Sequence, residues 1–428
     1  MTTTAIVLFG SFFIFLLLSV PVAFSLIISS SLALLTMDIS SVSTVFTKMF
    51  AEANSWLLLA IPFFIMVGFI MEKGGVTERL VNFADAIVGF LPGGLSATNI
   101  MASLFFGGVS GSSIADTSAN GTVLIPAMVR QGYGRRYSAA ITASSSPLGI
   151  IIPPSIPMIL WGFTAGISVA DLFLAGIGAG ILITIALLIV STIISIKRDY
   201  RSSTSFSLKK VFQTGKEGML ALVAPIIIIG GIVTGFVTPT EAGVLATVYS
   251  LFLGFFIFKE LNLKDLPEII LNTGKLTGTV MFIIAGAATF AHVLTLDQIP
   301  TRLANFVVNL NLTPTTLLIS LVILFIIIGM FLDANAAVIL IVPIIAPVIV
   351  QAGLDPYHAS VVLITTLGIG LLTPPVGLCV YVAAGIAGIK FEDIMKDVTP
   401  FAITLFVCVL ILVFFPQIIM TIPELLSS

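Results

Sequence analysis

Two aspartates stand inside long hydrophobic stretches of this sequence, where an ionised side chain is unfavourable. Asp116 lies within the stretch 95–130, and Asp333 lies within the stretch 314–350. A charged group at the centre of a membrane helix costs at least about 2.5 kcal/mol on insertion scales, so it commonly marks a path for a solute or an ion. The alternative is that each aspartate caps the start of a helix.

The residues next to each aspartate favour these two alternatives to different degrees. Asp116 is surrounded by serines and threonines that can share its hydrogen bonds, so capping and function stay equally open there. Asp333 has few polar neighbours other than Asn335, which favours a functional role. Whether Asp333 would hold an ion, a solute hydroxyl or a helix end is left open by the sequence.

Both aspartates lie in polar or glycine-containing runs that interrupt apolar sequence. The first run covers 107–116 and the second covers 329–335. In hydrocarbon every backbone amide and carbonyl needs a partner, so irregular chain is tolerated only where it lines a cavity or is buried in protein. We therefore predict re-entrant hairpins at 95–130 and 314–350, with tips that meet near the middle of the membrane.

Two double prolines form a second matched pair of interruptions. Pro153-Pro154 falls within 138–165, and Pro374-Pro375 falls within 357–388. Proline removes an amide donor and clashes with the carbonyl four residues earlier, so each pair should break its helix and free carbonyl oxygens. Such oxygens suit a hard cation such as sodium, while the amides where the helix restarts favour an anion.

The matched interruptions belong to a repeat of the whole chain. Asp116 precedes Pro126 by ten residues, as Asp333 precedes Pro343, and the double prolines recur 221 positions apart (374 − 153). The segment order also repeats, with five full crossings in each unit, so the second copy must enter the membrane from the opposite face. Inverted repeats with interrupted helices at matching places are typical of secondary transporters.

The composition agrees with a membrane protein and excludes several other classes. Of 428 residues, 58% are hydrophobic and 9% are charged, against about 25% charged in soluble domains. A formal net charge of −2 predicts no nucleic-acid partner. Cys379 and Cys408 indicate no disulfide framework and no transition-metal site. Phosphate-binding loops and zinc-protease motifs are missing from the sequence, so we expect no enzyme activity and no organic cofactor.

The predicted fold is an all-α polytopic membrane protein with two inverted repeats, re-entrant hairpins and discontinuous helices. The basic stretch from Lys197 to Lys216 should face the cytoplasm, and counting crossings from it places both termini on the outer side. The predicted divisions are a first repeat at 1–200 with scaffold helices in 1–75, a cytoplasmic linker at 201–217, and a second repeat at 218–428 with scaffold helices in 218–296.

Several single residues and segments have more ordinary interpretations. Glu241 is expected to cap a helix. Trp56 and Trp161 are expected to anchor the chain at the membrane interface. His292 and Asp297 are expected to lie at a solvated helix end rather than to form a proton relay. Short amphipathic pieces are expected to lie along the membrane surface; these are 40–52, 77–90, 262–273 and 300–310.

Together these residues resemble the large membrane subunit, the M or DctM type, of the tripartite ATP-independent periplasmic (TRAP) transporters. The resemblance spans essentially the whole chain. The matching stretches are GGVSGSSIADTSANGTVLIPAMVRQGY at 107–133, LGIIIPPSIPMILWG at 148–162, TPTEAG at 238–243, MFLDANAAVILIVPIIAPV at 330–348 and TPPVGLCVYVAAGI at 373–386.

The resemblance implies an elevator-type fold of the ion-transporter superfamily in a bacterial inner membrane, with periplasmic termini. It further implies sodium-driven import of an organic acid, such as a C4-dicarboxylate or sialic acid. A small four-helix Q subunit would enlarge the scaffold, and a periplasmic P protein would deliver the substrate. No Q-like segment precedes residue 1, so a separate Q chain is expected.

The resemblance also implies roles for individual positions. It assigns two or more sodium ions and a substrate cavity. One sodium would be held by Ser103, Ser110, Ser112, Ser145 and Gly149, a second by Gly329, Gly370, Thr373 and Val376, and the substrate by Asp116, Asn120, Ser155, Asp333 and Asn335. A stand-alone sodium- or proton-coupled anion carrier of the same superfamily is the alternative, and a membrane enzyme or channel is a third hypothesis.

Overall fold

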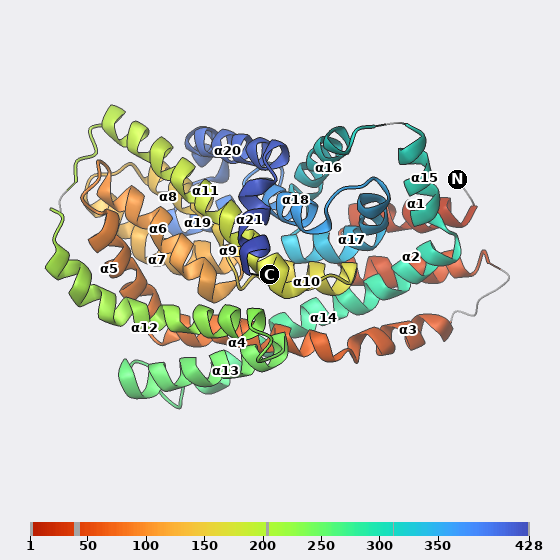
Figure 1. Ribbon diagram of the computed structural model, residues 1–428, viewed down its shortest axis with the longest axis horizontal. Coiled ribbons are helices and arrows are strands. Elements are labelled where there is room, and N and C mark those ends of the chain that lie inside the picture. Colours follow the sequence, from red (N-terminus) through yellow and green to blue (C-terminus); the bar gives the residue numbers. More distant parts are fainter. Residues whose placement is uncertain (1–2, 38–42, 203–204, 311, 427–428) are drawn as a thin grey trace.

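The computed structural model describes residues 3–37, 43–202, 205–310 and 312–426 (Figure 1). In these ranges all regular structure is helical and no strand occurs, which confirms the all-α prediction. Seven helical segments are long and apolar enough to cross a membrane, and a pair bent by 73° at residues 74–75 makes up to eight. The chain is therefore a multi-pass membrane protein.

The helices of the first half include one tight hairpin and one interrupted span. Their bounds are α1 Thr3–Leu17, α2 Val22–Leu34, α3 Ser43–Ala53, the 3₁₀ turn η1 Trp56–Leu59, α4 Ala60–Lys73, α5 Val76–Val88, α6 Gly94–Ser110, α7 Ser113–Arg130, α8 Arg135–Ser145, α9 Leu148–Ile151, α10 Ile156–Ala165 and α11 Val169–Lys197.

The helices of the second half follow the same order. Their bounds are α12 Leu208–Val233, α13 Pro239–Phe252, the π turn η2 Leu253–Ile257, α14 Leu266–Leu296, α15 Ile299–Asn309, α16 Pro314–Gly329, α17 Ala334–Gln351, α18 Pro356–Gly370, α19 Leu378–Ala387, α20 Phe391–Phe414 and α21 Gln417–Leu426.

The helices form two layers. In Figure 1, α3, α4, α12, α13 and α14 run along one side of the molecule, and the hairpins and interrupted helices lie on the other. In the repeat, α2 corresponds to α13 and α4 corresponds to α14. Each of these helices packs against a helix of the other half: α4 lies against α13, and α14 lies against α2. The same exchange occurs in the second layer, where α7 lies against α19 and α17 lies against α10.

Side-chain caps fix where several helices begin. Thr238 accepts a hydrogen bond from the Glu241 amide at 3.3 Å, and the Glu241 carboxylate accepts one from the Thr238 amide at 2.8 Å. This reciprocal capping box starts α13 and confirms the role predicted for Glu241. Ser168 similarly accepts from the Asp171 amide at the start of α11, at 3.2 Å.

The piece predicted at 40–52 is helical from Ser43 onward and packs along α14, and its residues 40–42 lie outside the described ranges. Two predictions about position were wrong. Residues 262–273 do not form a separate surface piece, because α14 begins at Leu266 and continues to Leu296. Trp161 is only 1% exposed, and its ring centroid lies 6.0 Å from that of Phe325, so it fills the protein core.

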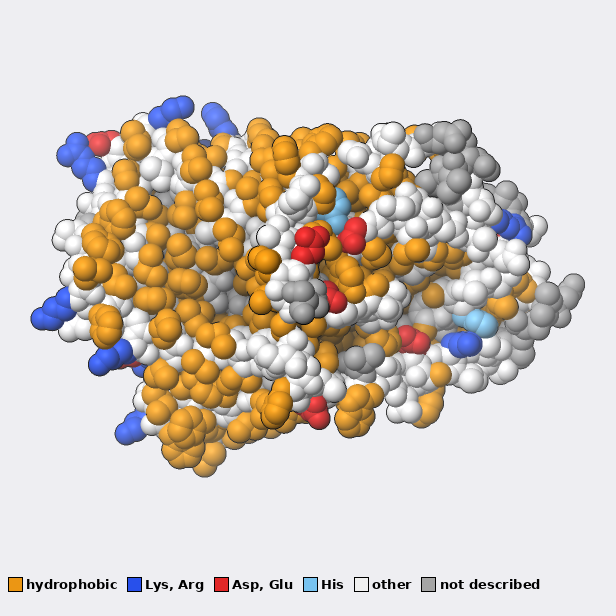
Figure 2. All heavy atoms as spheres, viewed as in Figure 1, with side chains coloured by type: hydrophobic (Ala, Val, Ile, Leu, Met, Phe, Trp, Pro, Cys, Tyr) orange, Lys and Arg blue, Asp and Glu red, His pale blue; other side chains and the backbone are white. Residues whose placement is uncertain are grey.

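The surface has the character expected in lipid. Hydrophobic side chains cover much of the left part of the face in Figure 2, and most Lys and Arg side chains visible there gather at that end of the long axis. On α11 a stripe of isoleucines at every fourth position is exposed, because helical neighbours at this spacing share a face. These are Ile181, Ile185, Ile189 and Ile193.

Candidate functional site

The first predicted hairpin turns sharply between α6 and α7. Gly111 adopts a left-handed conformation with φ of +62°, which favours glycine. A methyl group at this position would also lie 2.9 Å from the Pro154 carbonyl oxygen. Ser112 then caps α7 by accepting a hydrogen bond from the Ala115 amide at 3.4 Å. The cap of this helix is therefore Ser112 and not Asp116.

The hairpin tip lies directly on the break in the following span. A methyl group added at Gly149 would lie 2.9 Å from the Ser112 carbonyl oxygen. The Ile156 amide donates to the Gly111 carbonyl at 3.3 Å. Only a residue without a side chain permits so close an approach of two backbones.

The second half repeats this contact at the equivalent positions. A methyl group at Gly370 would lie 2.5 Å from the Gly329 Cα atom. The Val376 amide donates to the Met330 carbonyl at 3.3 Å. Both double prolines, moreover, contain a cis peptide bond between their two prolines. Each half therefore brings its hairpin tip and its break together in the same way.

Asp116 lies at the centre of a buried polar cluster. Its carboxylate accepts hydrogen bonds from Ser103 Oγ at 2.8 Å and from Asn120 Nδ2 at 2.7 Å. The Ser103 and Ser145 hydroxyl oxygens lie 2.9 Å apart, and the Ser145 hydroxyl also lies 3.2 Å from Asn99 Oδ1. Asp116 is completely buried. The structure thus groups it with serines predicted to bind sodium.

Two members of this cluster were missed by the sequence analysis. Asn99 donates from Nδ2 to Thr142 Oγ1 at 2.7 Å, and both residues are fully buried. The sequence signal for Asn99 was its four-residue spacing from Ser103, which places both polar side chains on one face of α6.

Asp333 occupies a different environment at the second tip. One carboxylate oxygen accepts from the Ala336 amide at 3.4 Å, which caps α17. The other accepts from Asn335 Nδ2, also at 3.4 Å. The structure therefore shows the helix-capping alternative for Asp333, and a cap of this kind leaves carboxylate lone pairs for a further partner.

Cys379 lies on α19, which packs against α7 of the first hairpin. Its side chain is completely buried.

The remaining predicted residues lie at the breaks and tips. Ser155 caps α10, accepting from the Met158 amide at 3.3 Å and donating to the Ile150 carbonyl at 2.7 Å. The Thr373 hydroxyl donates to the Ile369 carbonyl at 2.7 Å. The oxygens of both hydroxyl groups retain capacity to accept or to bind a cation. Val376 is 38% exposed beside the second break.

Unpaired oxygens occur at both tips. Asn120 Oδ1 and Asn335 Oδ1 are buried and have no hydrogen-bond partner among the described residues. Ser113 Oγ and Ser144 Oγ beside the first tip are likewise buried and have no hydrogen-bond partner among the described residues. A buried acceptor without a partner is unfavourable by about 1–3 kcal/mol, so these atoms are suited to an ion or a solute.

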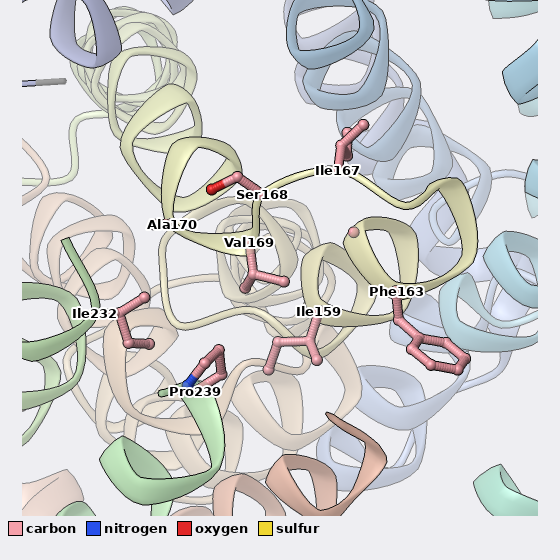
Figure 3. A pocket seen from close by; sticks show the side chains of 9 residues that line it. Ile159, Phe163, Ile167, Ser168, Val169, Ala170, Ile232 and Pro239 are labelled. Carbon is pink, nitrogen blue, oxygen red and sulfur yellow. The ribbon is translucent and has the colours of Figure 1, made fainter. Parts of the chain in front are cut away.

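An apolar cavity lies at the C-terminal end of the first interrupted span. Figure 3 shows Ile159, Val169, Ile232 and Pro239 converging on it from α10, α11, α12 and α13. Its volume is about 260 Å³. The Ser168 hydroxyl is committed to capping α11, so this cavity offers little that would orient a polar ligand.

Comparison with known proteins identifies the family. Residues 9–418 match the family described as tripartite ATP-independent periplasmic transporter, DctM component. The chain is 36% identical over 403 residues to the C4-dicarboxylate TRAP transporter large permease protein DctM of Pseudomonas aeruginosa, covering 94% of each chain. It is 36% identical over 405 residues to the sialic acid TRAP transporter large permease protein SiaM of Vibrio cholerae, covering 95% of each.

A solved structure supports the fold separately. The YdaH transporter of Alcanivorax borkumensis aligns with a TM-score of 0.61 over 87% of both chains, at 14% identity. That similarity concerns the fold alone, whereas the family match and the relatives concern ancestry. The chain therefore belongs to the DctM family of TRAP transporter large permeases.

Proposed function

We propose that this chain imports a small organic acid together with sodium, by an elevator movement of the hairpins and broken helices against the scaffold layer. The observation that carries the proposal is the pair of backbone contacts Ser112–Gly149 and Gly329–Gly370, which join tip and break in each half. Relatives with this architecture are transporters of C4-dicarboxylate and of sialic acid by their names.

The ion sites proposed here use oxygen ligands beside these contacts. The first comprises the hydroxyls of Ser103, Ser110, Ser112 and Ser145 with the backbone of Gly149. The second comprises backbone of Gly329, Gly370 and Val376 with the Thr373 hydroxyl. Sodium prefers oxygen ligands, and both places present them where helices are interrupted.

The substrate is proposed to lie between the tips, near Asn120, Ser155, Asp333 and Asn335. Asp116, assigned to this group from the resemblance, is better placed to support the first ion site through Ser103. Cation binding would then offset the unfavourable transfer of a carboxylate into a site of low dielectric constant.

TRAP large permeases work with a small permease and a periplasmic binding protein. One relative, the isethionate TRAP transporter permease protein DctMQ of Oleidesulfovibrio alaskensis, is 35% identical over 413 residues, and the matched region covers 65% of its length. For the present chain we propose a separate Q-type subunit, a P-type binding protein, the bacterial inner membrane and periplasmic termini. The domain limits 1–200, 201–217 and 218–428 remain predictions.

Reconstitution tests the proposal against the stand-alone carrier. Proteoliposomes containing this chain, its small permease and its binding protein should take up an organic acid only when sodium is present outside. Omission of the binding protein should abolish uptake. Equal uptake without sodium would contradict the proposed sodium coupling. Equal uptake without the binding protein would contradict the proposed dependence on that protein.

Substitutions at Thr373 and Ser112 should weaken sodium binding. Thr373→Val removes a hydroxyl but preserves the shape of the side chain. The sodium concentration for half-maximal uptake should therefore rise by roughly 3- to 10-fold, which is the effect of losing one contact about as strong as a hydrogen bond. Ser112→Ala should raise it similarly and also lose the α7 cap. Thr404→Val is the matched control, because Thr404, at a partly exposed position of α20, makes the same intrahelical bond, to Pro400 at 2.8 Å. Unchanged sodium curves for both variants would refute the ion-site assignment.

A further inference from the structure

A recess between the two layers contains an unusual group of polar side chains. Its volume is about 380 Å³, and it is bounded by α3 and α14 of one layer and by α10 and α17 of the other. Recesses of this size commonly hold small organic molecules. Its polar lining residues are Lys48, Glu52, Thr164, His292 and Thr295.

The position of the recess connects it with the second hairpin tip. Ile339 and Pro343 line it and lie one and two turns after Asn335, on nearly the same face of α17. The wall on α14 consists largely of small side chains, including Ala287, Ala288 and Ala291. A solute held there would therefore lie beside the helix that leads to Asp333.

The polar side chains have unused bonding capacity. Among the described residues no carboxylate lies within 4.0 Å of the Lys48 ammonium. Glu52 and His292 are within its electrostatic range. The hydroxyls of Thr164 and Thr295 donate to backbone carbonyls, at 2.7 Å and 2.8 Å, so their oxygens can still accept hydrogen bonds.

Such a group is unexpected in a chain with 9% charged residues. Ionisable side chains in membrane bundles generally face a water-filled cavity and mark the route of a solute. An ordinary alternative is a solvated pair, since Lys48 and Glu52 are four residues apart on one helix. That alternative does not account for the convergence of His292, Thr164 and Thr295 from two other helices.

We propose that this recess is a waiting site for a hydroxylated organic anion on its way to the hairpin tips. Lys48 binds the solute carboxylate, and Glu52, Thr164 and Thr295 accept hydrogen bonds from its hydroxyl groups. This inference rests on the proposed transport function and narrows its substrate class to acids that carry hydroxyl groups.

Uptake by the reconstituted complex gives the first test. Lys48→Gln should raise the half-saturating concentration of binding-protein-delivered acid by about tenfold, as expected for one charge-assisted hydrogen bond, and Lys48→Arg should largely restore it. Glu52→Gln should weaken uptake of a hydroxylated acid more than uptake of an acid of similar size without hydroxyls. Lys275→Gln is the control, because Lys275 is exposed on α14 and does not line the recess.

Thiol labelling gives a second test that does not require transport. Cys379 and Cys408 are buried, so Ala288→Cys supplies an accessible thiol in the recess wall. Two methanethiosulfonate reagents are compared, one with an anionic sulfonate group and one with a cationic trimethylammonium group. Lys48 should raise the labelling rate of the anionic reagent relative to that of the cationic reagent, and Lys48→Gln should remove this preference. Addition of a hydroxylated acid should slow the labelling, whereas Lys275→Gln should change nothing.

The outcomes separate the two proposals. If the wild-type complex transports no acid under a sodium gradient, the proposed function fails, and with it this inference. If wild type transports but Lys48→Gln matches Lys275→Gln in both uptake and labelling preference, only the waiting site is overturned. Loss of the labelling preference together with the tenfold rise in half-saturation supports it.

Discussion

Replacement of Asp333 by asparagine is expected to reduce sodium-driven uptake at least about 100-fold, while the protein still inserts and folds. Asparagine caps helices as well as aspartate does, so the start of α17 survives and only the negative charge is lost. A factor of 100 corresponds to about 2.7 kcal/mol, near the upper end for a hydrogen bond to a charged group. Initial uptake rates in proteoliposomes measure the effect.

Two further variants separate charge from capping. Asp333→Ala removes both, so it should also lower the thermal unfolding temperature, reflecting about 1 kcal/mol for a lost cap. Asp355→Asn makes the same chemical change at the cap of α18, where Asp355 accepts from the His358 amide at 2.8 Å, and should transport normally. Normal sodium-dependent transport by Asp333→Asn would remove Asp333 from the mechanism and leave it a structural cap.

Replacement of Gly370 by alanine is expected to abolish coupled uptake and to destabilise the protein. The added methyl group would lie 2.5 Å from Gly329, so the second hairpin tip must move away from the break. Overpacking of this kind costs about 1–3 kcal/mol, and the displaced backbone would no longer present the proposed ion ligands. Uptake and thermal unfolding in detergent should therefore both change.

The matched control is Gly385→Ala on α19. No heavy atom lies within 4 Å of a methyl group added there, and alanine is favoured over glycine in helices by up to about 1 kcal/mol. This variant should transport normally and unfold at the same temperature or higher. If Gly370→Ala behaved in the same way, a close fit between tip and break would not be needed for transport.

Features that depend on local chemistry could be predicted from the sequence. The double prolines interrupt their helices because proline cannot complete the hydrogen-bond ladder, and α9 ends at Ile151 just before the first pair. The Thr238–Glu241 capping box was likewise foreseen from three-residue spacing. These signals survive in any tertiary environment, which is why they were reliable.

Features that depend on which face meets lipid could not be predicted. Trp161 lies in a segment that is apolar on every side, so hydropathy does not distinguish an interface anchor from a core residue. Packing against Phe325, far away in the sequence, decided it. In the same way Ser112, rather than Asp116, became the cap, because Ser103 and Asn120 hold the Asp116 carboxylate.

The joints at Ser112–Gly149 and Gly329–Gly370 are built from peptide atoms rather than from side chains. Peptide atoms keep their chemistry when neighbouring residues are exchanged, provided that the glycines stay. Under the proposed mechanism, side chains elsewhere could therefore change to suit a new substrate, while the backbone contacts proposed to couple substrate movement to the ion gradient would stay unchanged.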